Sequence, residues 1–176
     1  MGDDEAGAAF ARAVELSQGQ FPDAVANLGR IHVVKGRWAE AIPLLRRADA
    51  IQPGVPVVRE NLRTALRNHG AALATAGRPA DAEALFRQGL DLGDDPALLL
   101  ELGGVVLEQG RVREALDLLE RAGHMRPRDP QSRAWLARGY ARAGDGDRAR
   151  SELAALAALD PVLAARVESE IAARTP

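Results

Sequence analysis

The chain has 176 residues, of which 47% are apolar and only 3% are aromatic, so leucine and small side chains must fill its core. The formal net charge of −2 excludes the dense positive field that a nucleic acid or an anionic membrane requires of its partner. The absence of cysteine excludes disulfides, thiol catalysis and thiolate metal sites, and we expect no cofactor and no bound metal.

The first element that we expect is a helix over residues 4–17, in which Phe10, Ala13 and Val14 share one face. The opening stretch MGDDEAGAAF has neither the basic region nor the apolar region of a signal peptide. No later stretch approaches the roughly 18 consecutive apolar residues of a membrane-spanning helix. We therefore expect a soluble, cytoplasmic protein.

After this helix, a pattern of small and apolar residues returns about every 34 residues, which is typical of a repeat protein. The first copy consists of Gly29, Gly36, Ala41, Leu45, Ala48 and Pro53. The later copies consist of Gly70, Gly77, Ala82, Phe86 and Gly89, then Gly103, Gly110, Ala115, Leu119, Ala122 and Pro127, and finally Ala137, Gly144, Ala149, Leu153, Leu156 and Pro161. The small residues predict helices that approach too closely for larger side chains, where overpacking costs about 1–3 kcal/mol.

Each copy is expected to fold as two helices joined by a tight turn, because a glycine near its middle supplies the backbone freedom that the turn needs. These turn glycines are Gly36, Gly77, Gly110 and Gly144. Aspartate followed by proline predicts the start of a helix, since the carboxylate caps the first turn and proline suits the first helical position. Such pairs occur at Asp95-Pro96, Asp129-Pro130 and Asp160-Pro161.

These signals divide the chain, expected to be a single domain over residues 1–176, into four repeats and two flanking helices. The repeats span residues 22–55, 56–95, 96–129 and 130–161, and the last helix spans residues 162–174. The second repeat has a longer first helix, expected over 57–76, because the spacing from Gly29 to Gly70 exceeds the period by about two helical turns. An apolar stripe in the last helix predicts that it covers the fourth repeat. The stripe consists of Leu163, Val167 and Ile171.

The segments NLGRIHVVKGRWAEAIPLLRRADAIQP and ELGGVVLEQGRVREALDLLERAGHMRP resemble the tetratricopeptide repeat (TPR) family, and the resemblance covers residues 22–161. It implies an all-α fold, a right-handed α–α superhelix (solenoid) of about four helix–turn–helix repeats with an N-terminal helix and a C-terminal capping helix. Family members often carry a tyrosine three residues after the small residue of the first helix, and only Tyr140 matches here. The resemblance also implies non-catalytic binding of a partner protein.

The residue pattern contains no catalytic constellation, so the chain is not expected to be an enzyme. The histidines His32, His69 and His124 lack the spacing of metal ligands, and His32 fills a core position of its helix. The acidic pair Asp145 and Asp147 imitates the metal-binding pair of many glycosyltransferases, but it falls in a turn between helices, where capping explains it.

The resemblance places the binding surface on the inner face of the superhelix, which the first helix of each repeat lines. The candidate partner-binding residues are Asn27, Arg30, Arg67, Asn68, Leu100, Leu107, Trp135, Arg138 and Arg142. Trp135 is the expected anchor, because tryptophan on a concave wall is a common hot spot, and packing against the neighbouring repeat or the terminal helix is the alternative. The arginines predict a partner with apolar and acidic residues, bound as an extended segment or a helix.

Three hypotheses of function follow. The first is a protein–protein interaction scaffold without catalysis. The second is a substrate-presenting segment of a larger enzyme, such as a glycosyltransferase, sulfotransferase or oxygenase. The helix over 4–17 is similar to the second helix of a repeat whose first helix is missing, so we expect a domain excised from a longer protein. The third is self-association through this N-terminal edge, where Phe10 and Val14 need a neighbour. The abundance of alanine and arginine is typical of a GC-rich bacterial genome.

Overall fold

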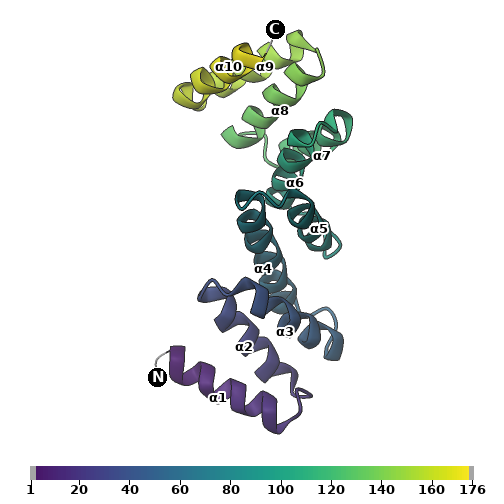
Figure 1. Cartoon of the computed structure of the whole chain (residues 1–176), viewed down its shortest axis with the longest axis vertical. Helices are drawn as coiled ribbons and strands as arrows, with labels where there is room; N and C mark the ends of the chain where they lie inside the picture. The colour runs from purple at the N-terminus through teal and green to yellow at the C-terminus, as the bar shows by residue number, and fades with distance from the viewer. Residues whose placement is uncertain (1–2, 175–176) are drawn as a thin grey trace. The chain divides into compact units, whose positions relative to one another are not determined.

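Figure 1 shows a computed structural model of the chain, which describes residues 3–174. Every regular element in these residues is an α-helix. The helices are α1 (Asp3–Leu16), α2 (Pro22–Val34), α3 (Trp38–Ile51), α4 (Pro56–Thr75), α5 (Pro79–Leu90), α6 (Pro96–Glu108), α7 (Val112–Met125), α8 (Pro130–Arg142), α9 (Gly146–Ala157) and α10 (Pro161–Arg174). The predicted fold class, helix–turn–helix repeats with one further helix at each end, is therefore confirmed.

The chain divides into two compact units between Leu92 and Gly93. The N-terminal unit contains α1 to α5, and the C-terminal unit contains α6 to α10. In the N-terminal unit, α2 packs on α3 and α4 packs on α5; in the C-terminal unit, α6 packs on α7 and α8 packs on α9. That the whole chain acts as a single domain stays a prediction.

Each of these helix pairs turns at the predicted glycine. The φ angles of Gly36, Gly77, Gly110 and Gly144 are 69°, 74°, 83° and 78°. These values lie in the left-handed region, which glycine adopts without the steric penalty of a side chain. In the first of the turns, the Arg37 N–H donates to the His32 carbonyl at 2.8 Å, which satisfies an acceptor at the end of α2.

In the first three repeats, the glycine of the first helix meets the large residue of the second helix, which explains the repeating pattern. A Cβ atom added at Gly29 would lie 2.7 Å from Leu45 Cγ, and one added at Gly103 would lie 2.7 Å from Leu119 Cγ. At Gly70 the added Cβ would lie 2.5 Å from the ring of Phe86. Contacts this short confirm that the paired helices approach too closely for a larger side chain.

The predicted aspartate caps are present at the starts of α6, α8 and α10. Asp95 accepts hydrogen bonds from the Ala97 and Leu98 N–H groups at 2.9 and 3.0 Å. Asp129 accepts from the Ser132 N–H at 2.9 Å. At α10, Asp160 accepts from the Leu163 N–H, also at 2.9 Å. Each cap satisfies backbone donors that the first helical turn leaves without a partner.

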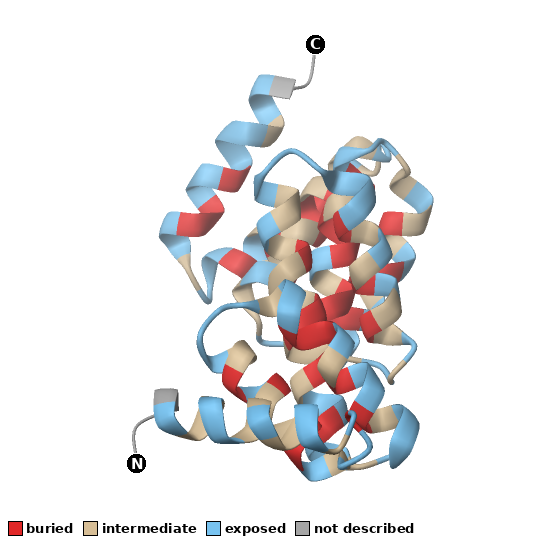
Figure 2. Ribbon diagram, turned by 60° about the horizontal axis from the view of Figure 1, so that its bottom comes forward, coloured by how far each residue is buried: buried red, intermediate tan, exposed pale blue. Residues whose placement is uncertain are grey.

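Each unit buries its own core along the facing sides of its helices, where Figure 2 shows the buried residues in red. In the N-terminal unit, Val25, Leu45 and Leu62 join α2, α3 and α4 in one cluster. In the C-terminal unit, α10 contributes buried Leu163 and Val167 to a cluster with residues of α8 and α9. Helix α10 therefore covers the fourth repeat, as its apolar stripe predicted.

Two helices differ in length or position from those of a regular repeat. The long helix expected over residues 57–76 is α4, which has 20 residues. Helix α1 packs on α2, and Val14 contacts the core of the N-terminal unit, whereas Phe10 is half-buried and Leu16 is exposed. In the described part of the chain, none of the helices has both the length and the apolar character needed to span a membrane.

Candidate functional site

A cavity of about 610 Å³ opens in the C-terminal unit, lined by residues of α6, α8 and α10. We call it the α8 groove. Its lining residues are Glu108, Gln131, Trp135, Arg138, Ala141, Arg142, Glu170, Ile171 and Ala173. Trp135, Arg138 and Arg142 belong to the predicted partner-binding set, and the structure brings these three together.

Helix α8 supplies one wall of the groove because of the spacing of its residues. Gln131, Trp135, Arg138 and Arg142 follow one another at intervals of three or four residues, so they share one face of the helix. The opposite stripe of α8, which includes Ala134 and other small residues, lies in the core. Because the small side chains of α8 lie in the core, its long side chains lie on the opposite face, toward the cavity.

Trp135 packs against a neighbouring helix, which was the alternative considered for it, and its role as a binding anchor stays a prediction. The indole ring packs against α6, because a Cβ added at Gly104 would lie 3.0 Å from its Cζ2 atom. The guanidinium of Arg138 lies over the ring, with its Cζ atom 5.0 Å from the centroid. The side chain nevertheless remains partly exposed and lines the cavity. A tryptophan held on two sides presents a rigid apolar surface to the groove.

Both arginines of the groove are held by carboxylates of the same unit. Arg138 donates to Glu170 of α10 from Nε at 2.9 Å and from Nη2 at 2.7 Å. Arg142 donates from Nη2 to Glu108 of α6 and from Nη1 to the carbonyl of Leu107, both at 2.6 Å. These bonds tie α8 to α10 and to α6, so the arginines are not presented as open sites for a partner's carboxylate.

The carboxylates of these ion pairs are more exposed than the arginines. The Arg138 side chain is 16% exposed and that of Glu170 is 44% exposed. The Arg142 side chain is 23% exposed and that of Glu108 is 49% exposed. The negative end of each pair therefore faces solvent, while the positive end lies deeper in the groove wall.

The structure corrects the placement of Leu107 and qualifies that of Leu100. Leu107 was expected on the inner face, but its side chain is fully buried. Helix α6 buries residues on nearly all sides, since it packs against both α7 and α8, so its sequence did not distinguish an inner face. Leu100 is half-buried and does not line the α8 groove.

Sequence reasoning missed the contribution of α10 to the site. Glu170, Ile171 and Ala173 line the groove, although this helix was considered only as a cap. The repeat period contains the missing signal: Ile171 follows Ala137 by one period, so α10 occupies the register of a further first helix. Extending the pattern by one unit would have predicted that α10 packs beside α8 as a further first helix does.

The predicted residues of the N-terminal unit form no single cluster. Asn27 and Arg30 line a smaller cavity of about 210 Å³ together with residues of α3 and α4. The Asn27 Nδ2 donates to the Asp23 carbonyl at 2.8 Å, so one of its donors is already used. Arg67 and Asn68 are half-buried on α4 and do not line this cavity.

Burial shifts the pKa values of a histidine in α2 and a tyrosine in α8. Burial lowers the pKa of His32 below 6.5, and the positive charge of Arg37 acts in the same direction. Burial also raises the pKa of Tyr140, and the hydrogen bond from its hydroxyl to Glu120 at 2.7 Å adds to this effect. Within residues 3–174, no group of three or more His, Cys, Asp and Glu side chains is arranged to hold a metal ion.

The acidic pair in the turn before α9 has structural partners. Asp145 accepts a hydrogen bond from the Arg148 N–H at 3.0 Å and thereby caps α9. This backbone bond, together with the Arg148 guanidinium, lowers the pKa of Asp145. Asp147 is exposed and pairs with Arg150. The capping predicted for this turn is confirmed at Asp145.

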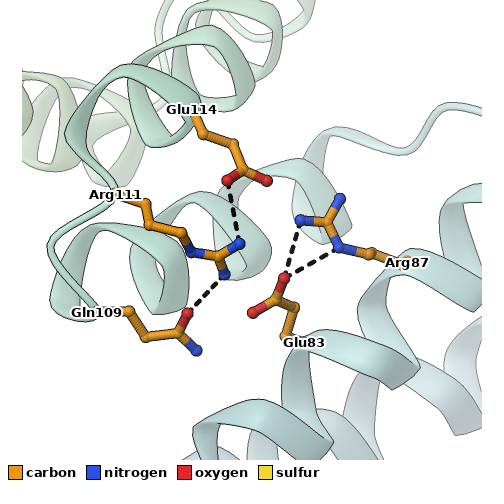
Figure 3. A network of polar contacts seen from close by, with 5 residues as sticks. All are labelled: Glu83, Arg87, Gln109, Arg111 and Glu114. Carbon is orange, nitrogen blue, oxygen red and sulfur yellow. Dashed lines mark hydrogen bonds and ion pairs between the residues drawn. The ribbon is translucent and has the colours of Figure 1, made fainter.

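Polar side chains elsewhere on the surface make local contacts within each unit (Figure 3). On α5 of the N-terminal unit, Arg87 donates to Glu83 from Nη2 at 2.9 Å and from Nε at 3.1 Å. In the C-terminal unit, Arg111 donates to Glu114 at 3.1 Å and to Gln109 at 2.5 Å. Exposed pairs of this kind contribute about 0.3–0.5 kcal/mol each, so they support the local helix geometry.

Comparison with known proteins identifies the repeats. A family model described as tetratricopeptide repeat matches residues 73–131 and 106–169, and a second model of the same description matches residues 23–95. No curated protein sequence matched the chain.

Solved structures share the fold at low sequence identity. YrrB, described as a TPR protein with an unusual peptide-binding site, aligns with a TM-score of 0.66 at 21% identity, over 94% of this chain and 85% of that chain. PilF of Pseudomonas aeruginosa aligns with a TM-score of 0.65 at 19% identity, over 92% and 71% of the two chains. MamA of Desulfovibrio magneticus RS-1 aligns with a TM-score of 0.62 at 13% identity, over 91% and 86%. At these identities the likeness shows the fold alone.

Proposed function

The chain belongs to the tetratricopeptide repeat family, and from this premise we propose that it binds an extended segment or a helix of a partner protein in the α8 groove. TPR repeats are protein-interaction scaffolds, and the proposal adds the surface and the form of the ligand. It includes no catalytic step. The expected cytoplasmic location and bacterial origin belong to the same proposal.

The observation that carries this proposal is the partly exposed Trp135 in a cavity of about 610 Å³. Tryptophan is enriched among residues whose truncation strongly weakens an interface, because its large rigid surface is desolvated on binding. Gly104 and Arg138 hold the ring in place, so little conformational entropy is lost when a ligand contacts it. The peptide-binding site of YrrB supports a peptide ligand for this fold.

The test compares the wild-type chain with Trp135→Ala in a pull-down from lysate, followed by titration of the captured protein in purified form. We expect Trp135→Ala to weaken the purified interaction by more than about 2 kcal/mol. Met125→Ala is the matched control, because Met125 is an exposed apolar residue that does not line the groove. Equal affinity of the groove variant and the wild type would place the interaction on another surface.

A further inference from the structure

The charges of the α8 groove are arranged in two ion pairs that leave the carboxylates outermost. Arg138 and Arg142 are the less exposed members, and Glu170 and Glu108 are the more exposed members. Arg166 of α10, whose side chain is 66% exposed, also approaches Glu170, with its Nε 4.0 Å from Oε1, which is longer than a hydrogen bond. A ligand that enters the groove therefore meets Glu170 and Glu108 before it meets Arg138 and Arg142.

An acidic ligand residue would have to compete with these carboxylates. Two N–H groups of Arg138 already point at Glu170, and two of Arg142 point at Leu107 and Glu108. Displacing them would leave Glu170 or Glu108 beside another negative charge, which is unfavourable. A basic ligand residue can instead approach the outer side of either carboxylate while both ion pairs stay intact.

Apart from the polar Gln131, the rest of the lining is apolar. Trp135, Ala141, Ile171 and Ala173 provide this surface. Arg138 covers part of the indole ring, so its alkyl stem also adds apolar area. The groove thus offers an apolar contact next to outward-facing carboxylates, and these two features lie within the reach of adjacent ligand residues.

From this arrangement we propose that the groove selects a partner segment in which lysine or arginine stands beside a large apolar residue. The apolar side chain contacts Trp135 and Ile171, and the basic group pairs with Glu170 or Glu108. This inference rests on the proposed function of the groove. The sequence predicted a partner with acidic residues, whereas the structure favours one with basic residues. The proposal names the chemistry of the ligand.

The probes are two short peptides with blocked ends, one alternating leucine with arginine and the other alternating leucine with glutamate. Binding is followed by tryptophan fluorescence in a Trp38→Phe background, in which Trp135 is the remaining tryptophan of the chain. We expect the basic peptide to change the Trp135 emission and to bind about tenfold more tightly than the acidic peptide at low ionic strength, with the difference shrinking in high salt.

Substitutions in the same background assign the preference to the groove. Glu170→Gln and Glu108→Gln are each expected to weaken the basic peptide by up to about fivefold, the usual range for an exposed ion pair. Glu168→Gln removes one charge from the same helix at an exposed position outside the groove, so it serves as the matched control and should leave the affinity unchanged.

The outcomes separate this inference from the function on which it rests. Tighter binding of the acidic peptide with a change in Trp135 emission would overturn the charge preference and leave the groove as the binding surface. Equal weakening by Glu168→Gln and Glu170→Gln would also overturn it, because net charge alone would then explain the effect. If neither peptide changed the Trp135 emission, both the proposed use of the groove and its preference would be wrong.

Discussion

Replacing Gly70 by alanine tests the close helix approach that underlies the repeat pattern. The added Cβ would lie 2.5, 2.9 and 3.0 Å from three atoms of the Phe86 ring. Phe86 is fully buried, so its rigid ring has no open space into which it can move. Overpacking of this kind costs about 1–3 kcal/mol, and the better helix propensity of alanine offsets about 1 kcal/mol of that, so we expect a net loss of up to about 2 kcal/mol.

The assay is urea unfolding followed by Trp38 fluorescence in a Trp135→Phe background, because Trp38 packs against the core of the N-terminal unit. Gly7→Ala is the matched control: Gly7 lies inside α1, and an added Cβ would be 3.7 Å from Ile31, an ordinary contact. The control should stabilise the unit by up to about 1 kcal/mol through helix propensity alone. The same substitution is thus expected to have opposite signs at the two positions.

A second variant tests the cause of the loss. The fourth repeat has alanine and leucine, Ala137 and Leu153, where the second has Gly70 and Phe86. Phe86→Leu should therefore relieve part of the overpacking, and the double variant should be about 1 kcal/mol more stable than the sum of the single effects predicts. Additive effects, or a Gly70→Ala variant as stable as the wild type, would refute the reasoning.

Two further predictions concern a turn and a half-buried histidine. Gly110 has a φ of 83°, and an added Cβ would have no atom within 4 Å. Gly110→Ala should therefore destabilise the C-terminal unit by about 1–2 kcal/mol through backbone strain alone, and Gly110→Asn should destabilise it by less. Equal losses for the two variants, in urea unfolding followed by Trp135 fluorescence, would contradict this prediction. The lowered pKa of His32 means that the unfolded chain binds a proton more readily than the folded chain, so its contribution to stability is fully present above pH 6.5 and is lost as the pH falls below that value. His32→Gln should flatten this pH dependence in unfolding experiments on the N-terminal unit, and an unchanged slope would assign the effect to other groups.

The fold could be predicted because its signals are local. Gly29 and Leu45, for example, stand at a fixed spacing, so the position of one predicts the residue that it contacts in the next helix. Asp95 likewise caps the helix that begins one residue later. A repeat protein is stabilised mainly by contacts between neighbouring elements, so a pattern within one unit contains most of the information about its structure.

The site was less predictable because it depends on contacts between repeats. Trp135 could be found as a candidate anchor, since residue type and helix face were sufficient. Whether Arg138 was available depended on Glu170, which lies on another helix and carries no repeat signature of its own. Leu107 was misplaced for a related reason, because two neighbouring helices cover α6 and remove the contrast between its faces.

The position of α10 in the repeat pattern explains why the same helix both covers the fourth repeat and lines the groove. In the first helices of the repeats, the small residue lets the second helix approach, as Gly103 does for Leu119. In α10 this position is Ile171, which packs partly on the core and also lines the groove beside Glu170. A ligand that contacts Trp135 together with either of these residues should therefore stabilise the docking of α10, by up to about 2.7 kcal/mol at a free ligand concentration of 100 times Kd. Loss of the cap would remove one wall of the groove and the partner of Arg138 at once, so cap stability and ligand affinity are thermodynamically linked.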